Sequence, residues 1–292
     1  MSYEYEYERS SYNEARMRTV TSKVSSQMNM LKRLLETPEG NMGTYHEGGS
    51  LNGSALSRTF ISHKKGLVNR DRYNVSFSQP KESVSVSIVL DISASMSAPI
   101  TLRGSAQERA LAKVGANPSV MSEVAYSAIA LLDGLDRSGI PCALALVEPS
   151  NIGYGSVNPR AIMVKDFNTR ITDEKKKKLV DLNPYTGTNL TEYAWVALDL
   201  LEGRDETHRI AIFMTDMGDS GSRGKLHSMS KQALFKGITL AGVGMDSTNN
   251  PYNERDYKNI LPNCLYAYSA ESFSGGIIPF LCEAVSTGRQ NY

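Results

Sequence analysis

From residue 83 onward, short apolar runs alternate with helical patterns, and two of these runs contain stretches that are apolar at every position, ALALV and IAIFM. A strand that is apolar on both faces is typical of a parallel sheet covered by helices on both sides. The predicted strands are Val84–Leu90, Cys142–Val147, Ala161–Phe167, Ile210–Thr215, Ile238–Val243 and Leu265–Tyr268. The predicted helices between them are Ser119–Arg137, Asp173–Leu182, Leu190–Leu201, Leu226–Phe235 and Glu271–Val285. This alternation predicts an α/β fold with a doubly wound, mostly parallel six-stranded sheet flanked by helices.

The chain divides at the point where this pattern begins. We expect residues 83–292 to form the α/β domain and residues 1–82 to form a tail, a helix and a connector. Residues 1–9 alternate Tyr with Glu, which predicts a mobile tail or a strand induced by a partner. Residues 38–82 are rich in Gly, Ser and Asn, which predicts an irregular connector with one short strand at Tyr73–Phe77.

The N-terminal helix has a clear start and stop signal. Ser11 and Glu14 form a capping-box pattern, and Pro38 disfavours helical geometry at Thr37. Between these signals one apolar stripe recurs at steps of three and four residues, through Met17, Val20, Val24, Met28, Leu31 and Leu35. We expect this stripe to pack on the main domain; the alternative is a helix that docks a partner subunit.

Composition excludes several function classes. The chain of 292 residues has 32 Lys and Arg against 31 Asp and Glu, so bulk charge gives no reason to expect binding to nucleic acid or to an anionic membrane. No apolar run approaches the about 20 residues that a membrane span needs. The three cysteines lie far apart in apolar segments, as small buried side chains do in a reducing compartment. We therefore expect a cytoplasmic protein.

Polar side chains gather where the predicted strands end. Asp91, Ser93 and Ser95 follow the first strand at alternate positions, and Asp216 follows the fourth. Thr188 lies in a Pro- and Gly-containing loop that leads into a helix. Ligands of open parallel sheets bind beyond the carboxyl ends of the strands, so these five residues are the candidate site.

The candidate ligands are all oxygen atoms. Carboxylates and hydroxyls without His or Cys select a hard cation, which predicts Mg²⁺, with Mn²⁺ or Ca²⁺ as alternatives. Because serine hydroxyls are neutral, the bound ion would keep much of its positive field and could accept a carboxylate from another protein. The structural alternative is a capped turn, in which Asp91 and Ser93 bond nearby backbone amides.

These motifs resemble a known family. Asp91-x-Ser93-x-Ser95, Gly187-Thr188-Asn189 and Thr215-Asp216 are similar to the metal-ion-dependent adhesion site of von Willebrand factor type A domains, over about residues 83–287. The resemblance implies that Asp91, Ser93, Ser95, Thr188 and Asp216 surround one divalent ion, with the serines as direct ligands.

The chain departs from that family at two positions beside the motif. Ala94 stands where the family usually has Gly, and Met217 separates Asp216 from Gly218. Both changes add a side chain near the expected metal. Segments 97–118 and 148–160 lengthen the loops and are expected to shape a partner surface.

A narrower resemblance includes the N-terminal region. The MNMLKRLLE helix, the GGSLNGSAL segment and the Asp-x-Ser-x-Ser strand are similar to the C-terminal half of the cobaltochelatase subunit CobT, of which short versions occur in tailed bacteriophages. The resemblance implies a subunit that works beside a hexameric AAA+ ATPase, as in cobalt and magnesium chelatase-like complexes.

Three functions remain open from the sequence. The first is a non-catalytic subunit that uses its metal site to bind an acidic residue on an AAA+ ATPase or on its client. The second is a metal-dependent hydrolase or phosphoryl-transfer enzyme that uses Asp91, Asp216 and Asp219. The third is a structural or adhesive protein of a virion. Residues 219–226, DSGSRGKL, lack the first Gly and the Ser or Thr after Lys of a phosphate-binding loop, so the chain is not expected to hydrolyse ATP alone.

Overall fold

The structure is a computed structural model. It describes residues 2–36, 44–45, 50–51, 73–74, 83–100, 119–148, 159–185, 187–216, 223–245, 255, 258–259, 261, 263–267 and 269–289. The contacts divide the chain into two units, one of residues 33–82 and one of residues 1–32 with 83–292.

The larger unit is built on a six-stranded sheet. Its strands are β4 Val84–Asp91, β5 Cys142–Glu148, β6 Arg160–Lys165, β7 His208–Thr215, β8 Ile238–Met245 and β9 Cys264–Ala267. The strand order is β6-β5-β4-β7-β8-β9. All neighbouring pairs are parallel except β5 with β6, which is antiparallel. The predicted doubly wound, mostly parallel α/β class is therefore confirmed.

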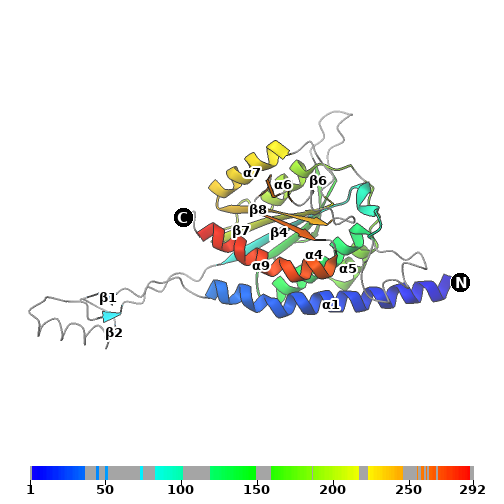
Figure 1. Ribbon diagram of the computed structural model, residues 1–292, viewed down its shortest axis with the longest axis horizontal. Coiled ribbons are helices and arrows are strands. Elements are labelled where there is room, and N and C mark those ends of the chain that lie inside the picture. The colour runs from blue at the N-terminus through cyan, green and yellow to red at the C-terminus, as the bar shows by residue number, and fades with distance from the viewer. Residues whose placement is uncertain are drawn as a thin grey trace, which may run out of the picture. The chain divides into compact units, whose positions relative to one another are not determined.

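Helices cover both faces of this sheet (Figure 1). They are α4 Val120–Arg137, α5 Asp173–Val180, α6 Leu190–Asp199, α7 Arg223–Phe235 and α9 Ala270–Arg289. On one face α6 contacts β4 and β7 and α7 contacts β8, while on the other α4 contacts β5 and α9 contacts β9. Each helix lies at its predicted place, and Ser119, Thr172 and Asn189 act as N-caps whose side chains accept backbone N–H groups.

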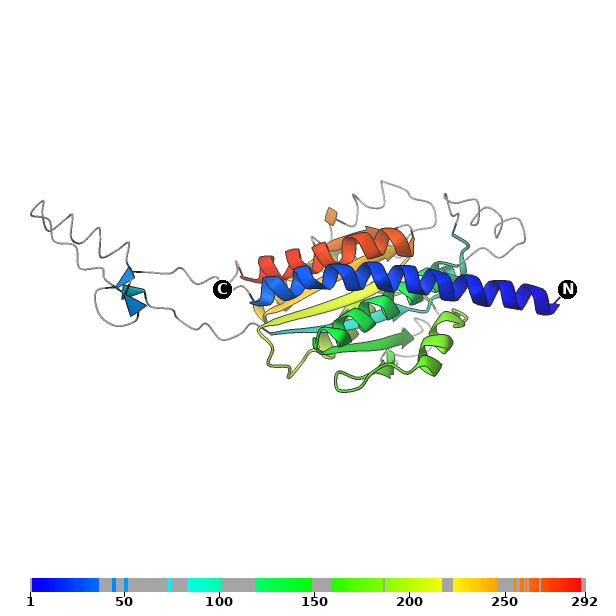
Figure 2. The same cartoon turned by 90° about the horizontal axis from the view of Figure 1, so that it is seen from below.

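The long helix α1, Ser2–Glu36, packs along α4 and α9 (Figure 2). The middle of the predicted stripe is buried, through Val20, Val24, Met28 and Leu31. A Cβ on Gly134 of α4 would lie 3.2 Å from Met28 Cγ and 3.2 Å from Val24 Cγ1, so the glycine lets the two helices approach closely. Lys23 Nζ donates to the backbone oxygen of Glu271 in α9 at 3.1 Å. The expectation that this helix packs on the main domain is confirmed.

The start of α1 corrects one prediction. Residues 2–9 are helical, so they are neither a tail nor a strand, and the helix begins nine residues before the capping-box serine Ser11. Glu and Arg are good helix formers, and each residue added to an existing helix gains a hydrogen bond without a new nucleation step. Alternation of Tyr and Glu is therefore compatible with helix when a long helix already follows it.

The unit of residues 33–82 holds a small antiparallel sheet. Its strands are β1 Thr44–Tyr45, β2 Ser50–Leu51 and β3 Tyr73–Asn74, in the order β1-β3-β2. The strand predicted at Tyr73–Phe77 is thus present at its first two residues, and the rest of it lies outside the described residues.

Other sequence expectations can be compared with the described part of the chain. Cys142 and Cys264 are buried, and all three cysteines are free thiols. Among the helices that the structure describes, none has the length and apolarity that crossing a bilayer would require. The two loop insertions fall largely outside the described residues.

The strand order reverses direction beside β4, which is where ligands bind in sheets of this kind. After β4 the chain builds β5 and β6 on one side, and then returns to build β7, β8 and β9 on the other. Ligand sites of doubly wound sheets lie at such a reversal, beyond the carboxyl ends of the two diverging strands. Here those ends carry Asp91 and Thr215.

Candidate metal centre

Asp91 is a fully buried carboxylate at the end of β4. Its Oδ1 accepts the backbone N–H of Ser93 at 2.7 Å and the Tyr193 hydroxyl at 2.8 Å. Its Oδ2 accepts the Thr215 hydroxyl at 2.7 Å. The bond from Ser93 is the one that the capped-turn alternative predicts, but the bonds from α6 and β7 join three separate segments. Asp91 is therefore the centre of a tertiary cluster as well as the cap of a turn.

The electrostatic environment of Asp91 is unusual. Burial raises the pKa of this carboxyl, and hydrogen bonds from Thr215, Ser93 and Tyr193 oppose that rise by favouring the ionised form. Within the described part of the chain, the groups that bond Asp91 are hydroxyls and a backbone N–H, all of them neutral. A buried carboxylate whose charge is not matched by a cation is costly, so this position favours a positively charged ligand.

Ser93 and Ser95 place two hydroxyls next to this carboxylate. Their Oγ atoms lie 3.0 Å apart, with Ser93 buried and Ser95 exposed. Ser93 precedes the short 3₁₀ helix η1, Ala94–Ser97, and its side chain does not cap that helix. The alternate spacing seen in the sequence thus brings two hydroxyls together at the sheet edge. Ala94, the departure from the family pattern, is exposed.

The loop before α6 runs along the same edge. The Tyr185 N–H donates to the backbone oxygen of Ile92 at 3.0 Å. The Tyr193 hydroxyl lies 3.1 Å from the backbone oxygen of Gly187. Thr188, which follows Gly187, is half-buried and directly precedes Asn189, the N-cap of α6. The helix start therefore fixes Thr188 in the loop that borders Asp91.

Asp216 directly follows β7 and is half-buried. It lies close enough to act on Tyr193, whose pKa is raised chiefly by burial, then by Asp91, and further by the Asp216 charge. Tyr193 consequently keeps its proton and remains a hydrogen-bond donor. The structure thus brings Asp91, Ser93 and Ser95 together, and it places Thr188 and Asp216 in adjoining segments of the same edge. Met217 and Asp219 lie outside the described residues.

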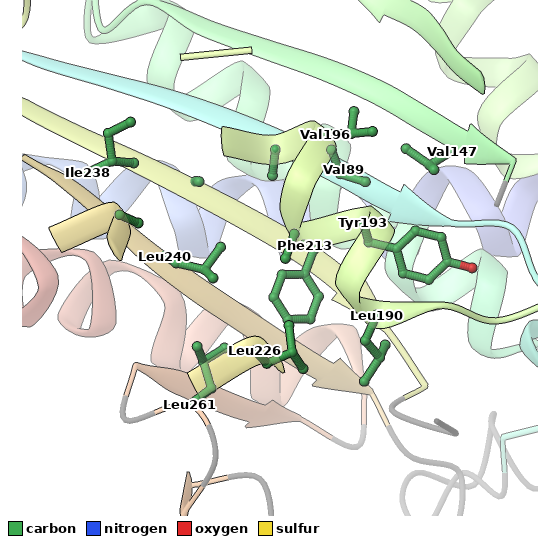
Figure 3. Packing of buried hydrophobic residues seen from close by; sticks show 14 of the residues in the cluster. Val89, Val147, Leu190, Tyr193, Val196, Phe213, Leu226, Ile238, Leu240 and Leu261 are labelled. Atoms are coloured by element: carbon green, nitrogen blue, oxygen red, sulfur yellow. The ribbon is translucent and has the colours of Figure 1, made fainter. Parts of the chain in front are cut away.

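Two residues of this cluster were not among the predicted site residues. Thr215 ends β7, and a hydroxyl at a strand end next to Asp216 is a signal that the sequence contains. Tyr193 sits four residues after the N-cap of α6 on the face that packs against the sheet. Figure 3 shows its ring within the apolar cluster and its hydroxyl directed toward the carboxyl end of β4. An aromatic residue in a helix stripe is normally read as core, and only the hydroxyl contact reveals its second role.

The donor set fits a divalent cation with a preference for oxygen. In the described part of the chain no group of three or more His, Cys, Asp or Glu side chains is arranged to hold a metal. A site at this edge would therefore combine two carboxylates with hydroxyls, which suits Mg²⁺ because that ion retains several waters and needs few protein ligands. The metal ligation by the five predicted residues stays a prediction.

The comparisons with known proteins are distant. The sequence matches no protein-family model and no curated protein. Similar solved structures include an aerotolerance-related membrane protein from Bacteroides fragilis, with 16% identity over 70% of this chain and 100% of that chain at a TM-score of 0.47. The PilB minor pilin from Streptococcus sanguinis has 13% identity over 76% of this chain and 65% of that chain, at 0.47. Proximal thread matrix protein 1 from the mussel byssus, with a zinc-occupied MIDAS motif, has 13% identity over 69% and 46%, at 0.46. At these identities and TM-scores the similarities assign no function to this chain.

Proposed function

We propose that this protein is a non-catalytic binding subunit that uses a divalent cation at the carboxyl edge of its sheet to bind an acidic side chain of another protein. One observation carries the proposal. Asp91 is fully buried, and its described bonding partners supply no positive charge. A cation would compensate the charge of this carboxylate, and the chain surrounds it with further oxygen atoms.

Each residue has a distinct part in this proposal. Asp91 supplies a fixed negative charge, because three segments hold its carboxylate in place. Ser93 and Ser95 would supply neutral hydroxyls, and Thr188 and Asp216 would add oxygen ligands from the loop before α6 and from the end of β7. When bound, the ion would supply a Lewis-acidic position that a partner's carboxylate can occupy. Mg²⁺ is the proposed ion, with Mn²⁺ or Ca²⁺ as alternatives.

The hydrogen bonding of Asp91 and the protonation of Tyr193 favour binding over catalysis. Both oxygens of Asp91 already accept hydrogen bonds, and burial keeps Tyr193 protonated. These groups are arranged to hold their positions and are poorly placed to exchange protons with a substrate. The proposed role is therefore recognition, with any turnover performed by a partner.

The partner is proposed from the sequence resemblance. The adhesion-site motifs and the CobT-like arrangement of the N-terminal helix and the Asp-x-Ser-x-Ser strand support a subunit of a chelatase-like complex. Its partner would be a hexameric AAA+ ATPase of that class, or the client of the ATPase, in the cytoplasm. Free buried thiols are compatible with such a reducing compartment.

The experiment separates metal binding from partner binding. Titration calorimetry with MgCl₂ and MnCl₂ first measures the ion affinity of the wild type, of Asp91→Ala and of Asp181→Ala, where Asp181 is an exposed carboxylate at the end of α5. A pull-down with a chelatase-type AAA+ ATPase then compares Mg²⁺ with EDTA. We expect Asp91→Ala to lose both ion binding and capture, and Asp181→Ala to keep both.

Equal capture in Mg²⁺, in EDTA and by Asp91→Ala would refute the metal-dependent role. Assays for phosphatase and nuclease activity with the same samples test the enzymatic alternative. A metal-dependent turnover that disappears in Asp219→Asn would replace the binding function with a catalytic one.

A further inference from the structure

The helices α6 and α7 leave a groove between them on one face of the sheet. It has a volume of about 810 Å³, and its floor includes Arg209 of β7 and Ile238 of β8. Trp195 and Leu198 line it from α6, and Met229 lines it from α7. The volume lies in the range of sites that bind ligands or peptide side chains.

The groove exposes one large apolar side chain, that of Trp195. Trp195, the single tryptophan of the sequence, is 50% exposed, while its neighbours Ala194 and Val196 are buried in the core. An exposed Trp beside a groove marks an interaction surface, because Trp is among the residues most often central to one.

Carboxylates outnumber cations along the groove by one. Three carboxylates line it, from Glu192, Asp199 and Glu202, against the cations of Arg209 and Lys236. The Arg209 guanidinium donates to the backbone oxygens of Arg204 and Lys236. Lys236 Nζ lies 3.9 Å from Glu202, with both side chains about 70% exposed, so this pair is weak. The field of the groove therefore favours a positively charged occupant.

We infer that this groove binds a segment of another protein that presents an apolar anchor flanked by Lys or Arg. The anchor would pack on Trp195, and the basic side chains would face Asp199 and Glu202. An amphipathic helix lying along the groove meets both demands. The net negative charge of the lining disfavours an anionic lipid or cofactor. The inference does not depend on the metal site.

The test uses a defined probe and the full chain in EDTA. The probe is a fluorescein-labelled 14-residue peptide of Leu and Lys with helical periodicity, and the matched peptide carries Glu in place of Lys. Anisotropy is expected to show saturable binding of the Lys peptide, at least tenfold tighter than that of the Glu peptide. The unlabelled Lys peptide is expected to shift the emission of Trp195, the sole indole.

Variants locate the binding on the molecule. Trp195→Ala is expected to weaken binding of the Lys peptide at least tenfold. Asp199→Lys is expected to weaken it about tenfold, while the same change at the exposed Asp181 of α5, outside the groove, is expected to alter it less than twofold. Thermal melting of each variant confirms that it folds.

The inference is overturned if the Lys peptide does not bind, if the two peptides bind equally, or if Trp195→Ala and Asp199→Lys leave binding unchanged. Tighter binding of the anionic dye ANS at Trp195, with no binding of the Lys peptide, would also overturn it in favour of a small anionic ligand. Because every sample contains EDTA, failure here leaves the metal-dependent function intact.

Discussion

Two buried ionic groups, Lys165 and Asp91, are treated in opposite ways by this protein. Lys165 of β6 is almost completely buried, and its Nζ lies 3.2 Å from Asp136 Oδ1. The same ammonium donates to the backbone oxygens of Cys142 at 2.5 Å and Asp166 at 3.2 Å. Asp91 is just as deeply buried, yet the described groups that bond it are neutral hydroxyls and an amide.

The difference separates a charge with an ionic partner in the chain from one whose described partners are all neutral. Lys165 brings its own counter-ion from α4, so its charge is compensated inside the chain. Asp91 has fixed dipoles around it, which orient the carboxylate but leave its net charge to be matched from outside. The Lys165–Asp136 pair joins β6 to α4, whereas the charge of Asp91 is the one that we propose a cation compensates.

The largest expected effect tests the closed pair. Lys165→Ala leaves Asp136 without its buried partner and opens a cavity, so we expect a loss of about 3 kcal/mol in the free energy of unfolding. Urea denaturation measures it. Lys177→Ala, at an exposed lysine of α5, is the control and should change stability by less than about 0.5 kcal/mol. A loss below about 1 kcal/mol for Lys165→Ala would show that the pair is not structural.

The next effect tests the open carboxylate. A ligand that binds only the folded state at a hundredfold excess over its Kd stabilises that state by about 2.7 kcal/mol. We expect Mg²⁺ to raise the free energy of unfolding of the wild type on this scale and to leave Asp91→Asn unchanged. Asp181→Asn carries the same chemical change on α5 and should respond to Mg²⁺ like the wild type. If Asp91→Asn kept the response, the ion would bind elsewhere.

A smaller effect tests the dipoles that hold Asp91. Tyr193→Phe removes one hydroxyl donor from a buried carboxylate, so we expect a loss of about 1–2 kcal/mol in EDTA. Tyr185→Phe is the matched control, because that hydroxyl bonds Glu148 at the exposed surface. Its expected cost is below about 0.5 kcal/mol. Denaturation curves that show equal costs for the two variants would mean that the Tyr193 hydroxyl does not secure the carboxylate.

The smallest effect probes the surroundings of Lys165. Burial raises the pKa of the Cys142 thiol from 9.0 to about 12, against the opposing pull of the Lys165 ammonium. The folded state therefore holds this proton more tightly than the unfolded chain does. Stability from this group is present in full well below pH 9 and falls as the pH rises from 9 toward 12, by about 1.4 kcal/mol at pH 10.

The measurement is the pH dependence of unfolding for the wild type and Cys142→Ala. The variant should show a shallower decline above pH 9, whatever its absolute stability. The native Cys142 thiol should also resist thiol reagents at pH 8 until the protein is unfolded. Identical slopes in the two proteins would contradict the raised pKa.

Much of the fold could be predicted from local patterns. Each of the six main strands lies within two residues of its expected bounds, since apolar runs and turn residues mark strand ends directly. The N-caps Ser119 and Asn189 carry the same kind of local signal. The tail prediction for residues 2–9 was wrong because a period of two does not by itself exclude helix when the next segment is strongly helical.

In the candidate site too, local patterns predicted some residues, while other contacts depend on the tertiary fold. Asp91, Ser93 and Ser95 could be assigned to one edge because parallel strands place their carboxyl ends together. The bonds from Tyr193 and Thr215 join residues 102 and 124 positions away from Asp91, so they depend on which strands are neighbours. No periodic pattern in the sequence shows which strands are neighbours in the sheet.

The sequence by itself determined the α/β class, the element bounds and the oxygen-rich character of the strand ends, because these follow from the alternation of apolar and polar residues. The tertiary structure decided that β4 lies between β5 and β7, that Asp91 is buried among neutral donors, and that Trp195 lines a groove formed by α6 and α7. Burial and charge compensation arise only when distant segments pack together, and for that reason the open carboxylate and the acidic groove became visible only in the folded molecule.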